Sequence, residues 1–260
     1  MFSHMKDFEL AGQVAVITGG GTGLGLAMAR GFVDAGARVV LVGRREAPLQ
    51  AACADLGPAA FARAHDVAAF ERAPELIAEI ERDVGPVSIL VNNAGIHLKK
   101  PVAEVTEGEI RAQMDIHVLG AHALSRAAYA RMNLRGQGSI LFIASMASLF
   151  GVPLVGAYAV AKSALLGLMR TMAVEWAPHG VRVNAIAPGW IETDITRGAV
   201  LSDPARLERI LQRTPLGRMG QPEDLAGAAV FLSSPAARFI TGVVLPVDGG
   251  VSMGFSRPGD

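Results

Sequence analysis

The chain has 260 residues, and its 24 basic and 24 acidic residues give a formal net charge of zero. This balance argues against a nucleic-acid or membrane-surface partner held by charge. Only 18% of the residues are charged and 51% are hydrophobic, which predicts further buried surface, most simply in a homo-oligomer. The single cysteine, Cys53, excludes an intrachain disulfide and fits a reducing, cytoplasmic compartment.

The length suits one large α/β domain rather than two. We expect residues 1–9 to be a disordered or tag-like N-terminus and residues 10–260 to form the domain. No uninterrupted apolar run reaches the length of about 18 residues that a membrane-spanning helix needs. Residues 1–6 lack the apolar core of a secretory signal, so we expect none.

The first strand is predicted over 13–18, an apolar and β-branched run. A glycine-rich loop follows, Gly19-Gly20-Gly21-Thr22-Gly23-Leu24-Gly25, and then a helical pattern to Gly36. In this context glycines let the backbone approach a pyrophosphate, and the helix N-terminus supplies N–H groups and a positive dipole end. The spacing is T-G-x-x-x-G-x-G rather than G-x-G-x-x-G, and the alternative is an ordinary flexible loop.

The second strand, predicted over 38–42, ends without the acidic residue that commonly binds ribose hydroxyls in NAD-binding folds. Gly43 stands there, followed by Arg44 and Arg45. Without a carboxylate, nothing repels a 2′-phosphate, and a guanidinium can bind it bidentately. The sequence therefore favours NADP(H) over NAD(H), although both arginines could simply be solvated at a helix start.

Helix and strand patterns then alternate. They predict helices over 47–56, 70–83 and 107–134, and strands over 60–64, 88–91 and 138–144. The strand at 88–91 runs into Asn92-Asn93-Ala94-Gly95, a sharp turn at the edge where open α/β sheets bind ligands. Such alternation with short connections predicts one doubly wound parallel sheet with helices on both faces.

Tyr158 and Lys162 lie four residues apart in a small-residue run, 157–173, that reads as a buried helix, so both side chains share one face. A cation beside the phenol would lower its pKa from about 10 and give a proton donor and acceptor usable near neutrality. Ser145, at the end of the preceding strand, could hold a substrate oxygen beside the phenol. Many ordinary helices carry such a pair, so this motif is specific only together with the rest of the chain.

The C-terminal part contains two more predicted strands, over 181–186 and 243–247, which complete a seven-stranded sheet. The first of them ends at Pro188-Gly189, again at the ligand edge. Between them, residues 190–216 are mixed and polar, and we interpret them as a substrate lid with a short helix over 205–212. An ordinary surface insertion remains the alternative.

Taken together, these residues resemble the short-chain dehydrogenase/reductase family over about residues 10–250. The motifs are the Thr18–Gly25 loop, Asp66-Val67, Asn92-Asn93-Ala94-Gly95, Ser145, Tyr158 with Lys162, Pro188-Gly189 and Asp248-Gly249-Gly250. The resemblance implies a single-domain Rossmann fold, a cytoplasmic homotetramer paired through the helices near 120–132 and 157–176, and an enzyme that interconverts a secondary alcohol and a ketone by hydride transfer.

By this resemblance, Tyr158 would be the general acid/base, Lys162 would lower its pKa and hold the nicotinamide ribose, and Ser145 would position the substrate oxygen. NADP, or alternatively NAD, would be held by Gly19, Thr22, Gly23, Leu24, Gly25, Arg44, Asp66, Val67, Asn93, Ala94, Gly95, Tyr158, Lys162, Pro188, Gly189, Ile191 and Thr193. No metal site is expected, because the six histidines include no H-E-x-x-H pair and one cysteine cannot form a thiolate cage.

His117 departs from the family pattern, which usually places an Asn there to help hold a water that connects the lysine to solvent. An imidazole can hydrogen-bond a water and carry a proton near neutral pH, so we expect a working but altered relay. The alternative is that His117 only packs and the relay is impaired.

Four further segments resemble sugar-acid and polyol dehydrogenases of the gluconate 5-dehydrogenase type, namely Lys100-Pro101, residues 173–177, Arg213-Thr214-Pro215 and residues 247–250. By this resemblance, Lys99 or Lys100 could meet a substrate carboxylate. A 3-oxoacyl-thioester reductase shares almost every motif and remains an alternative. A catalytically weak nucleotide-binding scaffold of the same fold is the alternative from another functional class. A small-molecule substrate is expected, with no nucleic acid and no membrane as partner.

Overall fold

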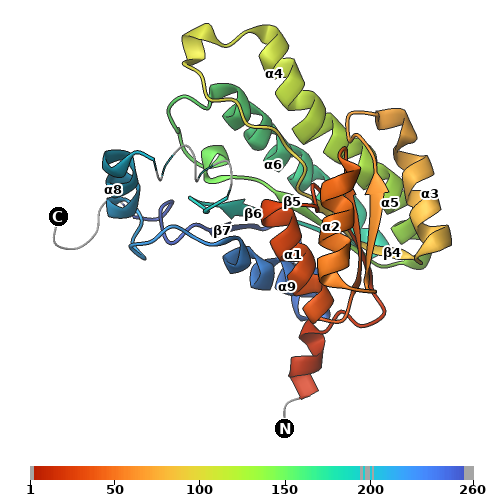
Figure 1. Cartoon of the computed structure of the whole chain (residues 1–260). Helices are drawn as coiled ribbons and strands as arrows, with labels where there is room; N and C mark the ends of the chain where they lie inside the picture. The colour runs from red at the N-terminus through yellow and green to blue at the C-terminus, as the bar shows by residue number, and fades with distance from the viewer. Residues whose placement is uncertain (1–2, 194–195, 197–199, 201, 255–260) are drawn as a thin grey trace.

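In the computed structural model, which describes residues 3–193, 196, 200 and 202–254, seven parallel strands form one sheet in the order β3-β2-β1-β4-β5-β6-β7 (Figure 1). The strands are β1 (Val14–Thr18), β2 (Arg38–Gly43), β3 (Ala60–Ala64), β4 (Val87–Asn92), β5 (Gly138–Ile143), β6 (Val181–Pro188) and β7 (Val244–Val247). The predicted doubly wound, seven-stranded Rossmann architecture is confirmed.

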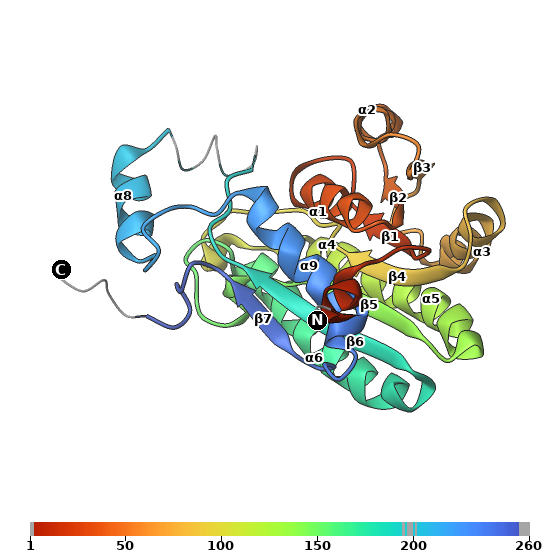
Figure 2. The ribbon, with the colours of Figure 1, turned by 90° about the horizontal axis from the view of Figure 1, so that it is seen from below.

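Helices cover both faces of the sheet (Figure 2). They are α1 (Gly23–Asp34), α2 (Glu46–Leu56), α3 (Ala73–Asp83), α4 (Glu107–Met114), α5 (Ala121–Arg135), α6 (Gly156–Trp176), α8 (Pro204–Gln212) and α9 (Ala226–Ser233). The helices α1, α2, α3, α6 and α8 each lie in a segment predicted as helical, and α4 and α5 share the single helix predicted over 107–134. Within the described part of the chain, no helix is both long and apolar enough to cross a membrane.

Side-chain alternation along the strands divides the core into two layers. In β1, Val14 and Val16 face the cluster formed with α3, α5 and α6, whereas Ala15 and Ile17 face the cluster formed with α1, α2 and α9. Because successive residues of a strand point to opposite faces, a fully apolar strand can serve both clusters. The near-continuous apolar runs in the sequence have this cause.

The segment predicted as one helix over 107–134 is interrupted. Between α4 and α5 the six residues Asp115–Gly120 form a π-helical turn, η4, which contains His117. One extra residue per turn rotates the following side chains, and such turns are often found at functional sites. The sequence pattern gave no sign of this change because the apolar residues continue through it.

The N-terminal segment differs from the expected disorder over its described residues. Residues Ser3–Phe8 form a short 3-10 helix, η1, and Phe8 stacks on Phe231 of α9 with ring centroids 6.0 Å apart. Asp7 pairs with Arg238 at 3.1 Å. These contacts attach the segment to the body of the domain.

The region expected to be a lid contains α8, close to its predicted bounds. This helix projects at one end of the molecule (Figure 1) and buries Ile210 in a small separate cluster with Val200 and Met219. Parts of the predicted lid, 194–195, 197–199 and 201, lie outside the described residues. The lid function stays a prediction.

Arg182 on β6 connects the sheet to α9 through a set of carbonyl groups. Its guanidinium donates to the carbonyl oxygens of Leu232 at 2.8 Å, Ile240 at 3.2 Å and Ser234 at 3.3 Å. Burial lowers the pKa of this arginine to about 10. These carbonyls compensate for the desolvation of the guanidinium charge. Without Arg182, they would lose their hydrogen-bond donor.

We therefore expect Arg182→Met to lower the free energy of unfolding by about 2–4 kcal/mol, because several buried carbonyls lose a charged donor. Urea denaturation followed by circular dichroism measures this change. The matched control is Arg111→Met on the exposed surface of α4, for which we expect a change of about 0.5 kcal/mol or less. Equal effects of the two variants would contradict the assigned role of Arg182.

Candidate active site

A large cavity of about 580 Å³ lies at the carboxyl edge of the sheet. In the strand order, β1 and β4 are neighbours, and the chain winds outward from them in both directions. The loops that follow these two strands therefore diverge and leave a crevice, which is where doubly wound sheets bind their ligands. The cavity is lined by both loops and by the ends of β2, β3, β5 and β6.

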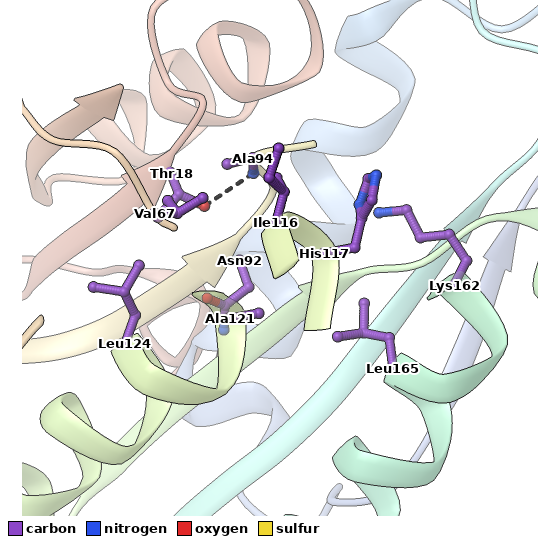
Figure 3. Close-up of a pocket in the computed structure, with 10 residues that line it drawn as sticks. All are labelled: Thr18, Val67, Asn92, Ala94, Ile116, His117, Ala121, Leu124, Lys162 and Leu165. Carbon is purple, nitrogen blue, oxygen red and sulfur yellow. Dashed lines mark hydrogen bonds between the residues drawn. The ribbon is translucent and has the colours of Figure 1, made fainter. Parts of the chain in front are cut away.

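Thr18, the last residue of β1, connects the two central loops. Its Oγ1 accepts hydrogen bonds from the backbone N–H groups of Asn93 and Ala94, both at 2.9 Å. Figure 3 shows the bond to Ala94. In return, Asn93 Nδ2 donates to the Thr18 carbonyl at 2.9 Å. The predicted Asn-Asn-Ala-Gly turn is thus fixed beside the glycine-rich loop.

The glycine-rich loop has the close packing and the helix end that a phosphate site requires. A Cβ on Gly25 would lie 2.2 Å from the Gly19 carbonyl oxygen, so the first turn of α1 can pack here only with glycine. Thr22, the N-cap of α1, makes no side-chain hydrogen bond to the first turn. The N-terminus of α1 therefore opens to the cavity and suits an anion.

The adenosine end of the cavity lies beyond the ends of β2 and β3. Arg44 and Arg45 are exposed and line it next to Gly43. Asp66, which follows β3, also lines the cavity, and its Oδ1 accepts a hydrogen bond from the backbone N–H of Ala68 at 3.0 Å. Two guanidinium groups without an acid at the end of β2 form a donor set that fits a 2′-phosphorylated adenosine.

Ser145, Tyr158 and Lys162 line the same cavity from β5 and α6. Lys162 is 4% exposed, and its Nζ donates to the Ile143 carbonyl at 2.6 Å and lies 5.6 Å from the Tyr158 ring centroid. Burial lowers the pKa of Lys162 to about 7. Tyr158 and Lys162, on one face of α6, thus line the same cavity as the Ser145 hydroxyl that follows β5, as the sequence predicted.

The expected lowering of the Tyr158 pKa by Lys162 is not found in this structure. Burial raises the pKa of the phenol, and the hydrogen bond with the Ser145 side chain acts in the opposite direction. Lys162 points to the Ile143 carbonyl, and its own charge is weakened by burial. Desolvation of the phenolate therefore outweighs the hydrogen bond with Ser145.

His117, in η4, is 3% exposed and packs edge-on against Tyr158 with ring centroids 5.4 Å apart. Its Nε2 lies 2.8 Å from the Ile96 carbonyl oxygen and 3.2 Å from the Ile96 nitrogen. Burial, and then the charge of Lys162, lower the pKa of His117 to about 3. The ring is neutral near pH 7, so the expectation that it carries a proton at neutral pH does not hold.

The cavity brings together all but one of the residues expected in the site. Gly25 does not line it and acts through packing instead. Gly189 has a similar packing role in addition to lining, because a Cβ there would lie 2.6 Å from the Asp248 Cα. Among the described residues, no cluster of three or more His, Cys, Asp or Glu could hold a metal ion.

Several lining residues were missed by sequence reasoning. They include His97, Trp190, Thr196 and Arg206. His97 follows the Asn-Asn-Ala-Gly turn almost directly, and this position is a signal that could have identified it. Arg206 lines the cavity only because of the way α8 packs, and no local sequence pattern reveals that packing.

The comparisons with known proteins agree with this geometry. A family profile described as "Enoyl-(Acyl carrier protein) reductase" matches residues 19–252. Gluconate 5-dehydrogenase of Gluconobacter oxydans is 38% identical over 254 residues, covering 96% of this chain and 99% of that protein. Galactitol 2-dehydrogenase (L-tagatose-forming) of Cereibacter sphaeroides is 41% identical over 249 residues, covering 95% and 97%.

Among solved structures, a gluconate 5-dehydrogenase from Burkholderia cenocepacia in complex with NADP and tartrate superimposes with a TM-score of 0.91. It is 38% identical and covers 97% of this chain and 100% of its own. With a profile and full-length relatives of this similarity, the chain belongs to the short-chain dehydrogenase/reductase family and is an oxidoreductase.

Proposed function

We propose that this enzyme interconverts a secondary alcohol and a ketone on a sugar acid or polyol, with NADP(H) as the hydride carrier. The observation that carries the proposal is the convergence of Ser145, Tyr158 and Lys162 in one cavity that also holds a complete dinucleotide cradle. Relatives named for gluconate and for galactitol support the substrate class.

The nicotinamide would supply or accept the hydride, and the residues of the chain would handle the proton. Ser145 would hold the substrate oxygen, and Tyr158, to which Ser145 is hydrogen-bonded, would donate or accept the proton at that oxygen. Lys162, with a pKa of about 7, would relay that proton at a pH near neutrality. Pro188, Gly189, Ile191 and Thr193 line the cavity beside this group and would support the nicotinamide.

The proposed quaternary structure is a homotetramer whose copies pair through α5 and α6, and the proposed compartment is the cytoplasm. Apolar side chains are exposed on these helices or just before them, namely Leu119, Leu134, Val160 and Val174. Exposed apolar groups of this kind on neighbouring helices suit an interface between copies. The single cysteine supports a reducing compartment.

Tyr158→Phe should lower kcat/KM by about 10²–10⁴-fold, the usual contribution of a general acid or base. Steady-state assays with gluconate, galactitol and the corresponding ketones would measure it, with acetoacetyl thioester as the alternative substrate. The control is Tyr129→Phe, which changes the chain's second tyrosine, whose ring stacks on Trp176 away from the cavity. Full activity in Tyr158→Phe would refute the mechanism, and activity on the thioester alone would refute the substrate class.

Arg44→Gln should weaken NADPH binding by about 10- to 100-fold and leave NADH binding unchanged, because only NADPH carries the 2′-phosphate. Fluorescence titration of the purified protein measures both dissociation constants. Arg45→Gln, measured in parallel, tells which of the two guanidinium groups makes the contact. A wild-type preference for NADH would overturn the assignment to NADP.

We also propose that His117 is a positioning residue that acts as a neutral ring. It holds the Ile96 backbone, and it borders a cavity of about 10 Å³ together with Asn92 and Lys162 (Figure 3). A cavity of about 10–15 Å³ accommodates one water when polar partners face it. His117 Nδ1 and Asn92 Oδ1 are buried without a protein partner, and both are able to accept from a water that serves Lys162.

His117→Asn should keep kcat within about threefold, because a carboxamide offers both a donor and an acceptor to Ile96. His117→Leu should lower kcat by about tenfold or more and shift the acidic limb of the pH profile of kcat, because the polar partners near Lys162 are lost. The measurement is the pH profile of kcat for the three proteins. An unchanged profile in His117→Leu would rule out any part for His117 in the relay.

A further inference from the structure

The segment that leads into α6 contains an unusual backbone conformation. Leu154, two residues before the helix, has a φ of 68°, and in the described part of the chain it is the one residue other than glycine with a positive φ. For a leucine, this left-handed conformation is less populated than the ordinary regions by about 5- to 30-fold. It persists only where surrounding contacts favour it, and such positions cluster at functional sites. Tyr158 follows four residues later, in the first turn of α6.

Two backbone contacts from Lys100 hold this segment in place. The Lys100 N–H donates to the Leu154 carbonyl at 2.7 Å, and Lys100 and Val155 form an isolated parallel bridge. Val102 packs on the first residue of α6, since a Cβ added to Gly156 would lie 3.0 Å from Val102 Cγ2. The chain after β4 therefore lies directly along the entry to α6.

This strap, residues 100–102, is anchored to α4 by the Lys100 side chain. Its Nζ donates to both carboxylate oxygens of Glu109 at 3.0 Å. Glu109 also accepts the Thr106 backbone N–H at 2.8 Å, in the capping box at the start of α4. Hydrogen bonds from Thr106 and then from Lys100 hold the pKa of Glu109 below its ordinary value, so the carboxylate is ionised at neutral pH. The Lys100 side chain thus has a charged acceptor whose own position is fixed.

Lys100 does not face the substrate. It does not line the large cavity, whereas Lys99, Val155 and Tyr158 do. Of the two lysines that the sequence offered for a substrate carboxylate, Lys100 is therefore engaged elsewhere, in its ion pair with Glu109. Its contacts connect α4 with the residues that precede the reacting group.

We propose that Lys100 is a positioning residue for Tyr158, because it stabilises the left-handed conformation of Leu154 and thereby fixes the direction in which the chain enters α6. The entry and the helix are coupled, because the Val155 carbonyl accepts the Ala159 N–H at 2.8 Å. A change at Leu154 therefore moves the turn that carries Tyr158. This inference rests on the proposed role of Tyr158 as the acid/base and adds to it a residue that lies outside the cavity.

The opposing effects are of similar size, which sets the expected magnitude. The side chains of the ion pair are 29% exposed for Lys100 and 32% exposed for Glu109. A pair with this access to solvent shifts an equilibrium by about 1.4- to 5-fold. That is less than the preference of a leucine against the left-handed region, so the backbone hydrogen bond contributes as well. Loss of the ion pair should therefore reduce the correctly positioned population several-fold rather than abolish it.

The first test measures the reduction of a six-carbon keto acid with NADPH by purified variants. Lys100→Met should lower kcat by about two- to fivefold and leave the KM for NADPH within about twofold. Lys100→Arg, which keeps the ion pair, should lose less activity than Lys100→Met. An ion pair that only stabilises the fold predicts instead a lower urea midpoint with an unchanged kcat, and this result would contradict the positioning role.

Leu154→Gly gives the sharpest comparison, because glycine adopts a positive φ without steric cost. In the Lys100→Met background, Leu154→Gly should restore most of the lost kcat. The matched control is Leu149→Gly in the same background. Leu149 is exposed in the same loop and has an ordinary φ of −105°, so this substitution should restore nothing. Equal effects of the two glycine substitutions would overturn the assigned role of Leu154.

Hydrogen exchange reports on the entry to α6 without turnover. Backbone amides of residues 156–162, followed by mass spectrometry, should exchange about two- to fivefold faster in Lys100→Met than in wild type. Adding Leu154→Gly should slow this exchange again. The amides of residues 14–18, in the central strand β1, should exchange equally in all proteins and serve as the internal control.

Each outcome decides a separate point. Unchanged kcat and unchanged exchange in Lys100→Met overturn the inference and leave the proposed function intact. Faster exchange with an unchanged kcat shows that Lys100 orders the helix without positioning Tyr158, and it also overturns the inference. If wild type turns over no sugar acid or polyol, the proposed function fails, whereas faster exchange that Leu154→Gly reverses still supports the action of the strap on α6.

Discussion

The hydrogen bonds of Thr18 are the constraint on which the site depends. At the centre of the sheet, the loops after β1 and β4 separate and open a crevice, and one hydroxyl holds both at a fixed distance. The glycine-rich loop on one side and the Asn-Asn-Ala-Gly turn on the other can then form a single cradle. Gly25 and Gly19 permit this approach, because a Cβ on them would lie 2.7 Å and 2.9 Å, respectively, from Asn93 Nδ2.

Burial of polar groups is the second theme of this structure. Lys162, His117 and Arg182 all lose water, and each is directed at backbone carbonyl groups rather than at a carboxylate. A carbonyl compensates part of the lost hydration without neutralising the charge, so the pKa values of all three fall. For Lys162, burial brings the pKa of the ammonium group close to neutral pH, which suits general acid–base chemistry.

The charged side chains around the large cavity lie on elements that are attached to the fold in different ways. Arg44 and Arg45 lie on the element that follows β2, and their place is fixed by the sheet. Arg206 lies on α8, which rests on its own small hydrophobic cluster and not on the two main core layers. The arginines after β2 are thus attached to the central sheet, whereas α8 is a peripheral helix that packs on a separate cluster.

Much of the fold and the site could be predicted from the sequence, because the signals are local. Apolar β-branched runs, glycine punctuation and the four-residue spacing of Tyr158 and Lys162 each depend on neighbours along the chain. These signals predicted the alternation of strands and helices. The resemblance to the family supplied most of the expected site residues, and all of these except Gly25 line the cavity. The local signals gave no sign that η4 interrupts a helix, or that Ser3–Phe8 would pack on α9.

The sequence by itself determined the order of the elements, the glycine-rich loop and the side chains that we propose to react. Only the tertiary structure decided the pKa shifts of His117 and Lys162, the packing role of Gly25, and the presence of both Lys99 and Arg206 in the lining of one cavity. The physical reason is that protonation depends on how far water is excluded by groups distant in sequence. The convergence of two charges likewise depends on how α8 packs, and neither quantity is written in any local pattern.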